Sequence, residues 1–251
     1  MENFNKEVKM YMIFDLLGDL ERTGPLLWKI ERNRLEDVKD HIFDLILMVQ
    51  ILKKYLPENL DYDKINEYII CHDLPEAITG DITEFEGITK EEKEKVTTIA
   101  IEYLEKQFND IFEFSKIINN YDNKNDLEAK IVYMLDKIHS ASAFIKYQSE
   151  QDIDMDNPDI IPELRNHPFV VQKIAEKMDL ADIFFEYHLK AVSINEEECQ
   201  KYNIKPNDAD KIVNVIKTFA TEMYTQKQNK TLLNVRHEFP KEAMKYKKSY
   251  H

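Results

Sequence analysis

The chain has 251 residues, 43% of them hydrophobic, and a formal net charge of −14. A chain of this length and apolar content can bury one large core, or one main domain with an extension. The negative charge argues against a nucleic-acid polymer as partner, and no stretch reaches the ~18 uncharged apolar residues that a membrane span requires.

Helix-forming residues dominate the composition. The chain has only 4 glycines and 8 prolines, and Glu, Lys, Leu, Ile and Met are abundant, so we expect an all-α fold. Cys71 and Cys199 are too few for a disulfide framework. The first residues lack the basic-then-apolar pattern of a secretory signal, and we therefore expect a soluble, cytoplasmic protein.

Apolar periodicity and capping residues predict the helices in chain order. Gly24-Pro25 ends the first apolar stretch and Pro57 stops the second. Thr89 with Glu92 makes a capping box, and Asp126 is a suitable N-cap for the helix after it. We predict helices at residues 5–22, 38–55, 62–78, 90–108, 112–120, from 127 through Asp136, 168–192 and 208–228, with an exposed linker at 151–158 and a basic tail at 241–251.

Two histidines and two aspartates, drawn from three separated segments, form a candidate ligand set for one divalent cation: His41, His72, Asp73 and Asp136. On a helix, neighbouring His72 and Asp73 lie about 100° apart and can both reach one ion. Such a set leaves coordination positions open, and it does not decide between Mn, Co, Fe, Ni, Zn and Mg. A lone histidine such as His41 on an apolar helix is more often a hydrogen-bonded core residue than a ligand, and Asp136 alone could be a solvated boundary residue, so the metal site is predicted from the four residues together.

Two further acids follow the His-Asp pair. Glu76 lies one helical turn after Asp73, and Pro75 should bend or end the helix near it. Gly80 can turn the chain and direct Asp81 back toward the ligands. A carboxylate beside a metal can take a proton from water, and Glu76 and Asp81 are the candidates for this catalytic role.

These residues resemble the H…HD…D signature of the HD-domain metal-dependent phosphohydrolases. The stretch His72–Asp81 is similar to the HDxxE…GD segment of their 5′-deoxynucleotidase branch, residues 36–41 resemble its ESVxEH segment, and Arg22-Thr23-Gly24 resembles its RTGW. The resemblance covers roughly residues 10–150. It implies that Arg22 binds the substrate phosphate.

The chain departs from this family pattern in one substrate-contacting position. Pro25 stands where a tryptophan follows the RTG residues, and Trp28 comes three positions later. Trp28 is either a replacement for the family tryptophan in substrate binding or a core residue. Lys137, next to Asp136, is expected to form a structural salt bridge.

The resemblance also bears on the number of metals. HD proteins that hold two metals have additional histidines between the HD pair and the last aspartate, and this chain has none between Asp73 and Asp136. We therefore expect one metal and a phosphohydrolase acting on a small nucleotide, most simply a (deoxy)nucleoside 5′-monophosphate. In that reaction, water activated by the metal attacks phosphorus.

Two alternatives stay open. The substrate could be another phosphoester or pyrophosphate, such as an alarmone, or the chain could be a non-enzymatic, metal-stabilised helical interaction module. Intact Glu76 and Asp81 argue against the module. We assign residues 1–150 to an HD-domain helical bundle and residues 151–251 to a helical extension packed on it, of unknown role. Homo-oligomerisation is left open.

Overall fold

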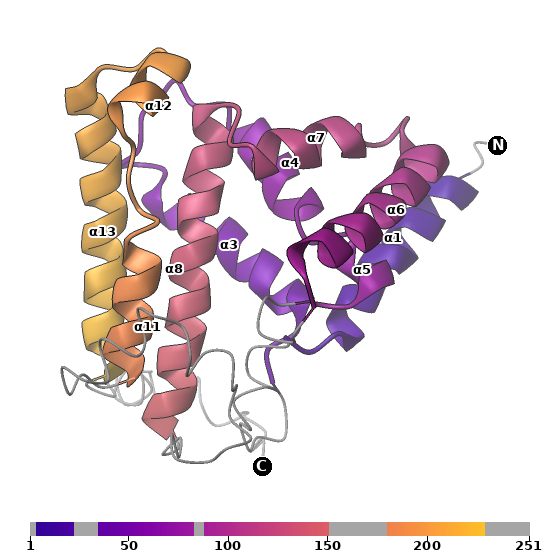
Figure 1. Ribbon diagram of the computed structural model, residues 1–251, viewed down its shortest axis with the longest axis horizontal. Helices are drawn as coiled ribbons and strands as arrows, with labels where there is room; N and C mark the ends of the chain where they lie inside the picture. Colours follow the sequence, from indigo (N-terminus) through magenta and orange to yellow (C-terminus); the bar gives the residue numbers. More distant parts are fainter. Residues whose placement is uncertain (1–3, 23–34, 83–87, 151–179, 229–251) are drawn as a thin grey trace, which may run out of the picture.

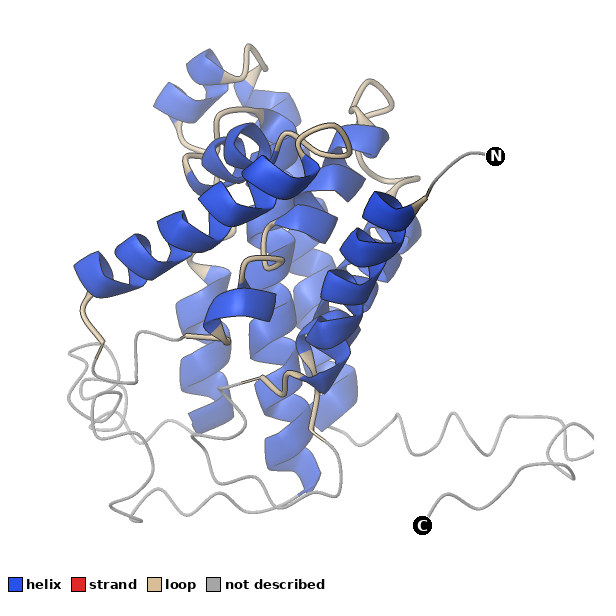
Figure 2. Cartoon of the chain, turned by 90° about the vertical axis from the view of Figure 1, so that its right-hand side faces the viewer, coloured by secondary structure: helices blue, strands red, loops and turns tan. Residues whose placement is uncertain are grey.

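The computed structural model describes residues 4–22, 35–82, 88–150 and 180–228. Within these ranges the chain is helical, as predicted, and the ribbon in Figure 2 contains helices and no strand. The only extended pairing in the described ranges is one antiparallel bridge between Glu21 and Asp37. The helices are α1 (Asn5–Leu16), α3 (Val38–Leu52), α4 (Tyr62–Cys71), α5 (Glu76–Thr79), α6 (Lys90–Phe108), α7 (Phe114–Asp122), α8 (Leu127–Glu150), α11 (Leu180–Leu189), α12 (Glu196–Lys201) and α13 (Pro206–Gln228).

Helix α8 is the centre of the fold. Helices α3, α4 and α7 pack on one side of it, and α11 and α13 lie along the other (Figure 1). Since α8 has neighbours on both sides, its apolar residues are buried around most of its circumference. They include Ala129, Ile131, Val132, Met134, Leu135 and Ile138. The helix that carries Asp136 is therefore held firmly in place.

Helices α1, α5 and α6 pack together in another part of the structure, and α12 packs on α13. Helix α6 packs against α5 and α7, and α1 contacts α5. The capping box predicted at the start of α6 is confirmed, because Thr89 and Glu92 exchange side-chain to backbone hydrogen bonds. Among the described helices, none is both long and apolar enough to cross a bilayer.

Two predicted helices, 5–22 and 62–78, end six or more residues earlier than expected. The first stops at Leu16, followed by a 3₁₀ turn at Leu17–Asp19, because the chain then pairs with residues 36–38 instead of continuing the helix. The Arg22 N–H donates to the Glu36 carbonyl at 2.8 Å, and the Val38 N–H donates to the Leu20 carbonyl at 2.9 Å. This pairing fixes Arg22 beside the start of α3.

The predicted helix 62–78 is broken after Cys71. Pro75 has no N–H, and its ring would clash with the Cys71 carbonyl if the helix continued. His72 is therefore the C-cap of α4, and the short helix α5 begins at Glu76. Asp73 therefore lies in the short connection between α4 and α5.

The bounds of the other helices differ less from those predicted. Helix α3 stops at Leu52, and the short element predicted at 112–120 is α7 at Phe114–Asp122. Helix α12 was not predicted, although Asn195 and Glu198 form its capping box. The helix predicted at 168–192 is described only from Leu180 and ends at Leu189. The linker at 151–158 and the tail at 241–251 lie outside the described residues.

Asp126 connects α8 to α4 and provides a test of the fold. Its carboxylate accepts hydrogen bonds from the Ala129 N–H at 2.9 Å and the Tyr68 hydroxyl at 2.7 Å, and it pairs with Lys64 at 2.7 Å. Asp126→Ala removes a helix cap and two polar partners at once. We expect a loss of about 2 kcal/mol, or a Tm lower by roughly 4–8 °C, in thermal unfolding.

Asp126→Asn is the matched control, because asparagine can keep the cap through Oδ1, whereas its NH₂ group replaces the oxygen that accepts from Tyr68 and pairs with Lys64. Burial by itself would raise the pKa of Asp126. The bonds from Lys64, Ala129 and Tyr68 outweigh burial and lower this pKa. A depressed pKa in the folded state stabilises the protein above the unfolded pKa, and this contribution is lost as the pH falls below about 4. The difference between wild type and Asp126→Ala should therefore shrink in acid. An unchanged difference at low pH would contradict this role.

Candidate metal centre

The four predicted ligands come together from three elements. His41 is in the first turn of α3, His72 and Asp73 follow α4, and Asp136 lies in the middle of α8. His41 Nε2 lies 3.4 Å from Asp73 Oδ2 and 3.4 Å from Asp136 Oδ1. His72 Nε2 lies 3.2 Å from the same Asp73 oxygen. Ligand atoms of His41, His72 and Asp73 thus lie within 4.8 Å of one another, and Asp136 adjoins this group through its contact with His41.

The two imidazoles have the unsatisfied atoms that a ligand site requires. Nε2 of His41 and Nε2 of His72 are both buried and have no hydrogen-bond partner among the described residues. A buried polar atom without a partner costs free energy, so two of them aimed at the same carboxylate need an explanation. A divalent cation held between His41, His72, Asp73 and Asp136 supplies one, and the donor set is typical of transition metals.

A hydrogen bond on the far side of the His72 ring orients its Nε2 atom. His72 Nδ1 lies 2.9 Å from the Ile69 carbonyl oxygen, and a carbonyl can only accept, so Nδ1 donates and, in the neutral ring, Nε2 carries the lone pair. The backbone around His41 is fixed by the N-cap of α3, where the Asp37 carboxylate accepts from the Asp40 N–H. The His72 ring and the backbone that carries His41 are therefore held in place by the protein itself.

Burial and charge set the protonation states of the cluster. Burial, assisted by the nearby Arg22 charge, lowers the pKa of His41 to about 3, so this imidazole is neutral. Burial also acts on His72, but the Asp73 and Asp136 carboxylates outweigh it and raise the pKa of His72. Despite burial, Lys137 and His41 hold the pKa of Asp136 well below its usual range. Ionised carboxylates around a neutral imidazole favour a cation at this point.

The two predicted catalytic acids lie beside this cluster. Glu76 is the first residue of α5, and its Oε2 is buried without a hydrogen-bond partner among the described residues. Burial first, and then the charges of Asp73 and Asp81, raise the pKa of Glu76 well above its usual range. The predicted turn at Gly80 is confirmed by its φ of 79°, a conformation that favours glycine, and the buried Asp81 follows it.

Arg22 places a positive charge beside Asp73 and Asp81. Its Nη1 lies 3.2 Å from Asp73 Oδ2 and its Nε lies 3.8 Å from Asp81 Oδ2. The guanidinium thus bridges a predicted ligand and a predicted catalytic acid. Trp28, the other predicted substrate contact, lies outside the described residues.

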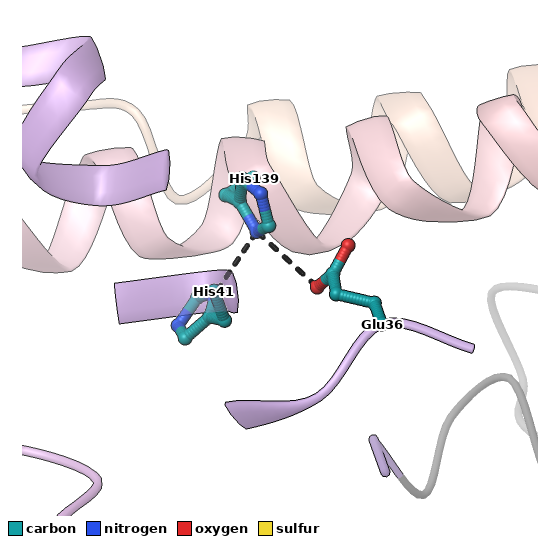
Figure 3. Close-up of side chains that lie close together, drawn as sticks. All are labelled: Glu36, His41 and His139. Carbon is teal, nitrogen blue, oxygen red and sulfur yellow. Dashed lines mark hydrogen bonds and ion pairs between the residues drawn. The ribbon is translucent and has the colours of Figure 1, made fainter. Parts of the chain in front are cut away.

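Three residues near Asp136 make contacts in or beside the site, and the sequence did not assign any of them to it. The salt bridge predicted for Lys137 is made to Asp136 itself, with Nζ 3.0 Å from Oδ2. The Tyr121 hydroxyl lies 3.4 Å from the same oxygen. His139 lies on the next turn of α8 and faces His41 (Figure 3). Its spacing of three residues from Asp136 was the available sequence signal.

Known proteins resemble the chain in sequence and fold. The protein named 5′-deoxynucleotidase HDDC2 from Homo sapiens is 29% identical over 174 residues, which cover 64% of this chain and 80% of that protein. The 5′-deoxynucleotidase hdd1 from Schizosaccharomyces pombe is 24% identical over 155 residues, covering 58% of this chain and 76% of its own length.

A solved structure shares the fold. It is described as a "Predicted metal-dependent phosphohydrolase" from Magnetospirillum magnetotacticum, with a TM-score of 0.55 and 13% identity over 88% of this chain and 92% of its own. The family description "HD domain" matches residues 15–164, a range that contains all four predicted ligands and both predicted catalytic acids. The chain therefore belongs to the HD-domain family.

Proposed function

We propose that this protein is a metal-dependent phosphohydrolase that releases phosphate from small nucleotides, and that its substrates are deoxynucleoside 5′-monophosphates. The observation that carries the proposal is the convergence on Asp73 of the Nε2 atoms of His41 and His72, which have no hydrogen-bond partner among the described residues, beside the buried Oε2 atom of Glu76. Relatives named as 5′-deoxynucleotidases support the nucleotide class. His41, His72, Asp73 and Asp136 would hold the ion.

A divalent cation in this position polarises a phosphoryl oxygen and makes a nearby water more acidic. Glu76 is suited to accept the proton of the attacking water, because its Oε2 atom is buried and has no competing hydrogen-bond partner in the described part of the chain. The raised pKa of Glu76 also makes it a stronger base than an exposed carboxylate. Asp81 faces the Arg22 side chain and would keep the guanidinium directed at the phosphate.

Charge explains why the proposed substrate is a mononucleotide. The chain carries a net charge of −14, which repels a long polyanion. A single phosphate needs only local cations, and Arg22 lies inside the site with Lys137 close to Asp136. One metal ion and one fork-shaped guanidinium are sufficient to offset the charge of a terminal phosphate.

Arg22→Ala is expected to raise KM and lower kcat/KM for a deoxynucleoside monophosphate, because the guanidinium would contact phosphate in both the ground and the transition state. Loss of one charged hydrogen-bonding partner corresponds to about 10–100-fold in kcat/KM. Arg22→Lys is the matched control and should recover part of the loss, since lysine keeps the charge but not the fork. Equal steady-state constants for wild type and Arg22→Ala would remove Arg22 from the substrate site.

The substrate class is tested by measuring phosphate release from purified protein with Mn²⁺, Co²⁺ or Mg²⁺. The panel contains deoxy- and ribonucleoside 5′-monophosphates, diphosphates, a cyclic dinucleotide and an alarmone. We expect release from the deoxynucleoside monophosphates and none from the cyclic dinucleotide. Robust cleavage of the alarmone or the cyclic dinucleotide, with monophosphates untouched, would overturn the nucleotidase assignment and leave the metal site standing.

A further inference from the structure

His139 is a buried histidine whose two ring nitrogens both contact other polar groups. Its Nδ1 lies 2.8 Å from His41 Nδ1, and its Nε2 lies 3.1 Å from Asp44 Oδ2. The His139 side chain is 7% exposed and that of His41 is 0% exposed. Figure 3 shows the His139 ring on α8 facing His41 on α3, with Glu36 on its other flank.

The contacts alternate between the two helices. Asp136 and His139 are one turn apart on α8, and His41 and Asp44 are one turn apart on α3. His41 lies between Asp136 on its Nε2 side and His139 on its Nδ1 side. The contacts therefore form a continuous row that ends at the candidate metal centre and runs through Asp44, His139, His41 and Asp136.

The positions of the ring protons on His41 and His139 determine which group donates and which accepts in each of these hydrogen bonds. If Nε2 of His41 binds a metal, Nδ1 of His41 must carry the ring proton and donate it to Nδ1 of His139. Nδ1 of His139 then accepts, so the ring proton of His139 sits on Nε2 and is donated to the Asp44 carboxylate. Every nitrogen in the pair is satisfied in this arrangement. A doubly protonated His139 would set two N–H groups against each other at 2.8 Å.

We propose that His139, with Asp44, is a positioning residue that holds His41 in the tautomer and orientation needed for metal binding. This inference rests on the proposed metal site. An imidazole ligand that donates its second nitrogen to an acceptor binds metal more tightly, because the ring is held in place and its free nitrogen is more basic. Glu36, whose Oε1 is 3.8 Å from His139 Nδ1, is too far away for a hydrogen bond but adds negative charge beside the ring.

The same side chains could be read as a second metal site, since ligand atoms of Glu36, His41 and His139 all lie within 4.8 Å of one another. Geometry argues against this. Two nitrogens bound to one tetrahedral zinc ion at ~2.0–2.1 Å would be roughly 3.3 Å apart, whereas the His41 and His139 nitrogens are at a hydrogen-bonding distance of 2.8 Å. His41 would also have to lose both ring protons to serve two ions.

The first test is the tautomer of His139 in the wild-type, full-length protein loaded with Zn²⁺. Two-bond ¹H–¹⁵N correlation spectra of protein with ¹⁵N-labelled histidine distinguish the tautomers. We expect His139 with its proton on Nε2 and His41 with its proton on Nδ1. A proton on Nδ1 of His139 would overturn the proposal, and so would two Zn²⁺ ions per chain in elemental analysis.

The second test is the metal dissociation constant, measured by competition with a chelator using Co²⁺. His139→Phe keeps a ring and removes both nitrogens, and it should weaken binding by about 10–100-fold. His139→Gln can still accept from His41 and donate to Asp44, and it should recover most of that affinity. Equal affinity in wild type and His139→Phe, or equal losses in His139→Phe and His139→Gln, would contradict the positioning role.

Tyr68→Phe is the structural control. It removes the hydrogen bond to Asp126 and lowers stability without touching His41, so its Co²⁺ affinity should equal that of the wild type. Neither readout depends on turnover. Failure of the nucleotidase assignment would leave these results intact, whereas a wild-type protein that binds no metal would refute both the proposed centre and this inference.

Discussion

Asp73→Ala is expected to abolish metal retention and phosphate release together. The Asp73 Oδ2 atom lies 3.4 Å from His41 Nε2 and 3.2 Å from His72 Nε2, so it is the atom on which both imidazoles converge. Without this carboxylate, the remaining ligands must compete with water for the ion, and the loss of bound metal removes the activated water. Metal content by elemental analysis and phosphate release are measured on the same preparations.

Glu67→Ala is the matched control for this experiment. Glu67 is an exposed carboxylate on α4, the helix that ends at His72, so its removal takes one acid from the same element without touching the cluster. Helix content by circular dichroism shows whether each variant is folded. Full metal occupancy in folded Asp73→Ala would refute the ligand assignment.

Glu76→Gln should keep the metal and lose turnover by about 10²-fold or more, as expected for a general base that can no longer accept a proton. Glutamine has nearly the same shape, so the change isolates ionisation from packing. KM should change little, because Glu76 would act on water and not on the nucleotide. The measurements are kcat, KM and metal content of wild type and variant.

Glu94→Gln supplies the comparison for Glu76. Glu94 is an exposed glutamate on α6 that forms an ion pair with Lys90, and the same substitution there should leave kcat unchanged. A Glu76→Gln protein with full metal and a kcat within about twofold of wild type would assign Glu76 a structural role.

The helices around the candidate centre could be predicted because their signals are local. The capping box of Thr89 and Glu92 and the N-cap at Asp126 depend on neighbouring residues alone, and both occur in the structure. The four ligand candidates could be named because their residue types and order are informative before any contact is known. Gly80 was assigned correctly for the same reason, since its positive φ is a backbone requirement.

The remaining features depend on distant contacts. The end of the first helix at Leu16 follows from pairing between residues 20–22 and 36–38, which no local pattern specifies. The contact of His139 with His41 exists only because α8 packs against α3. Helix α12 has six residues, too few for periodicity to be detected, although its capping box was present in the sequence.

The most direct test of the proposed metal-dependent chemistry is a titration of metal-free protein with Mn²⁺ or Co²⁺, in which bound ion and phosphate release from a deoxynucleoside 5′-monophosphate are measured on the same samples. We expect no release without metal, an increase in proportion to the bound ion, and saturation at one ion per chain. Full phosphate release by the metal-free protein, or release that begins only after a second ion has bound, would contradict a single metal held by His41, His72, Asp73 and Asp136.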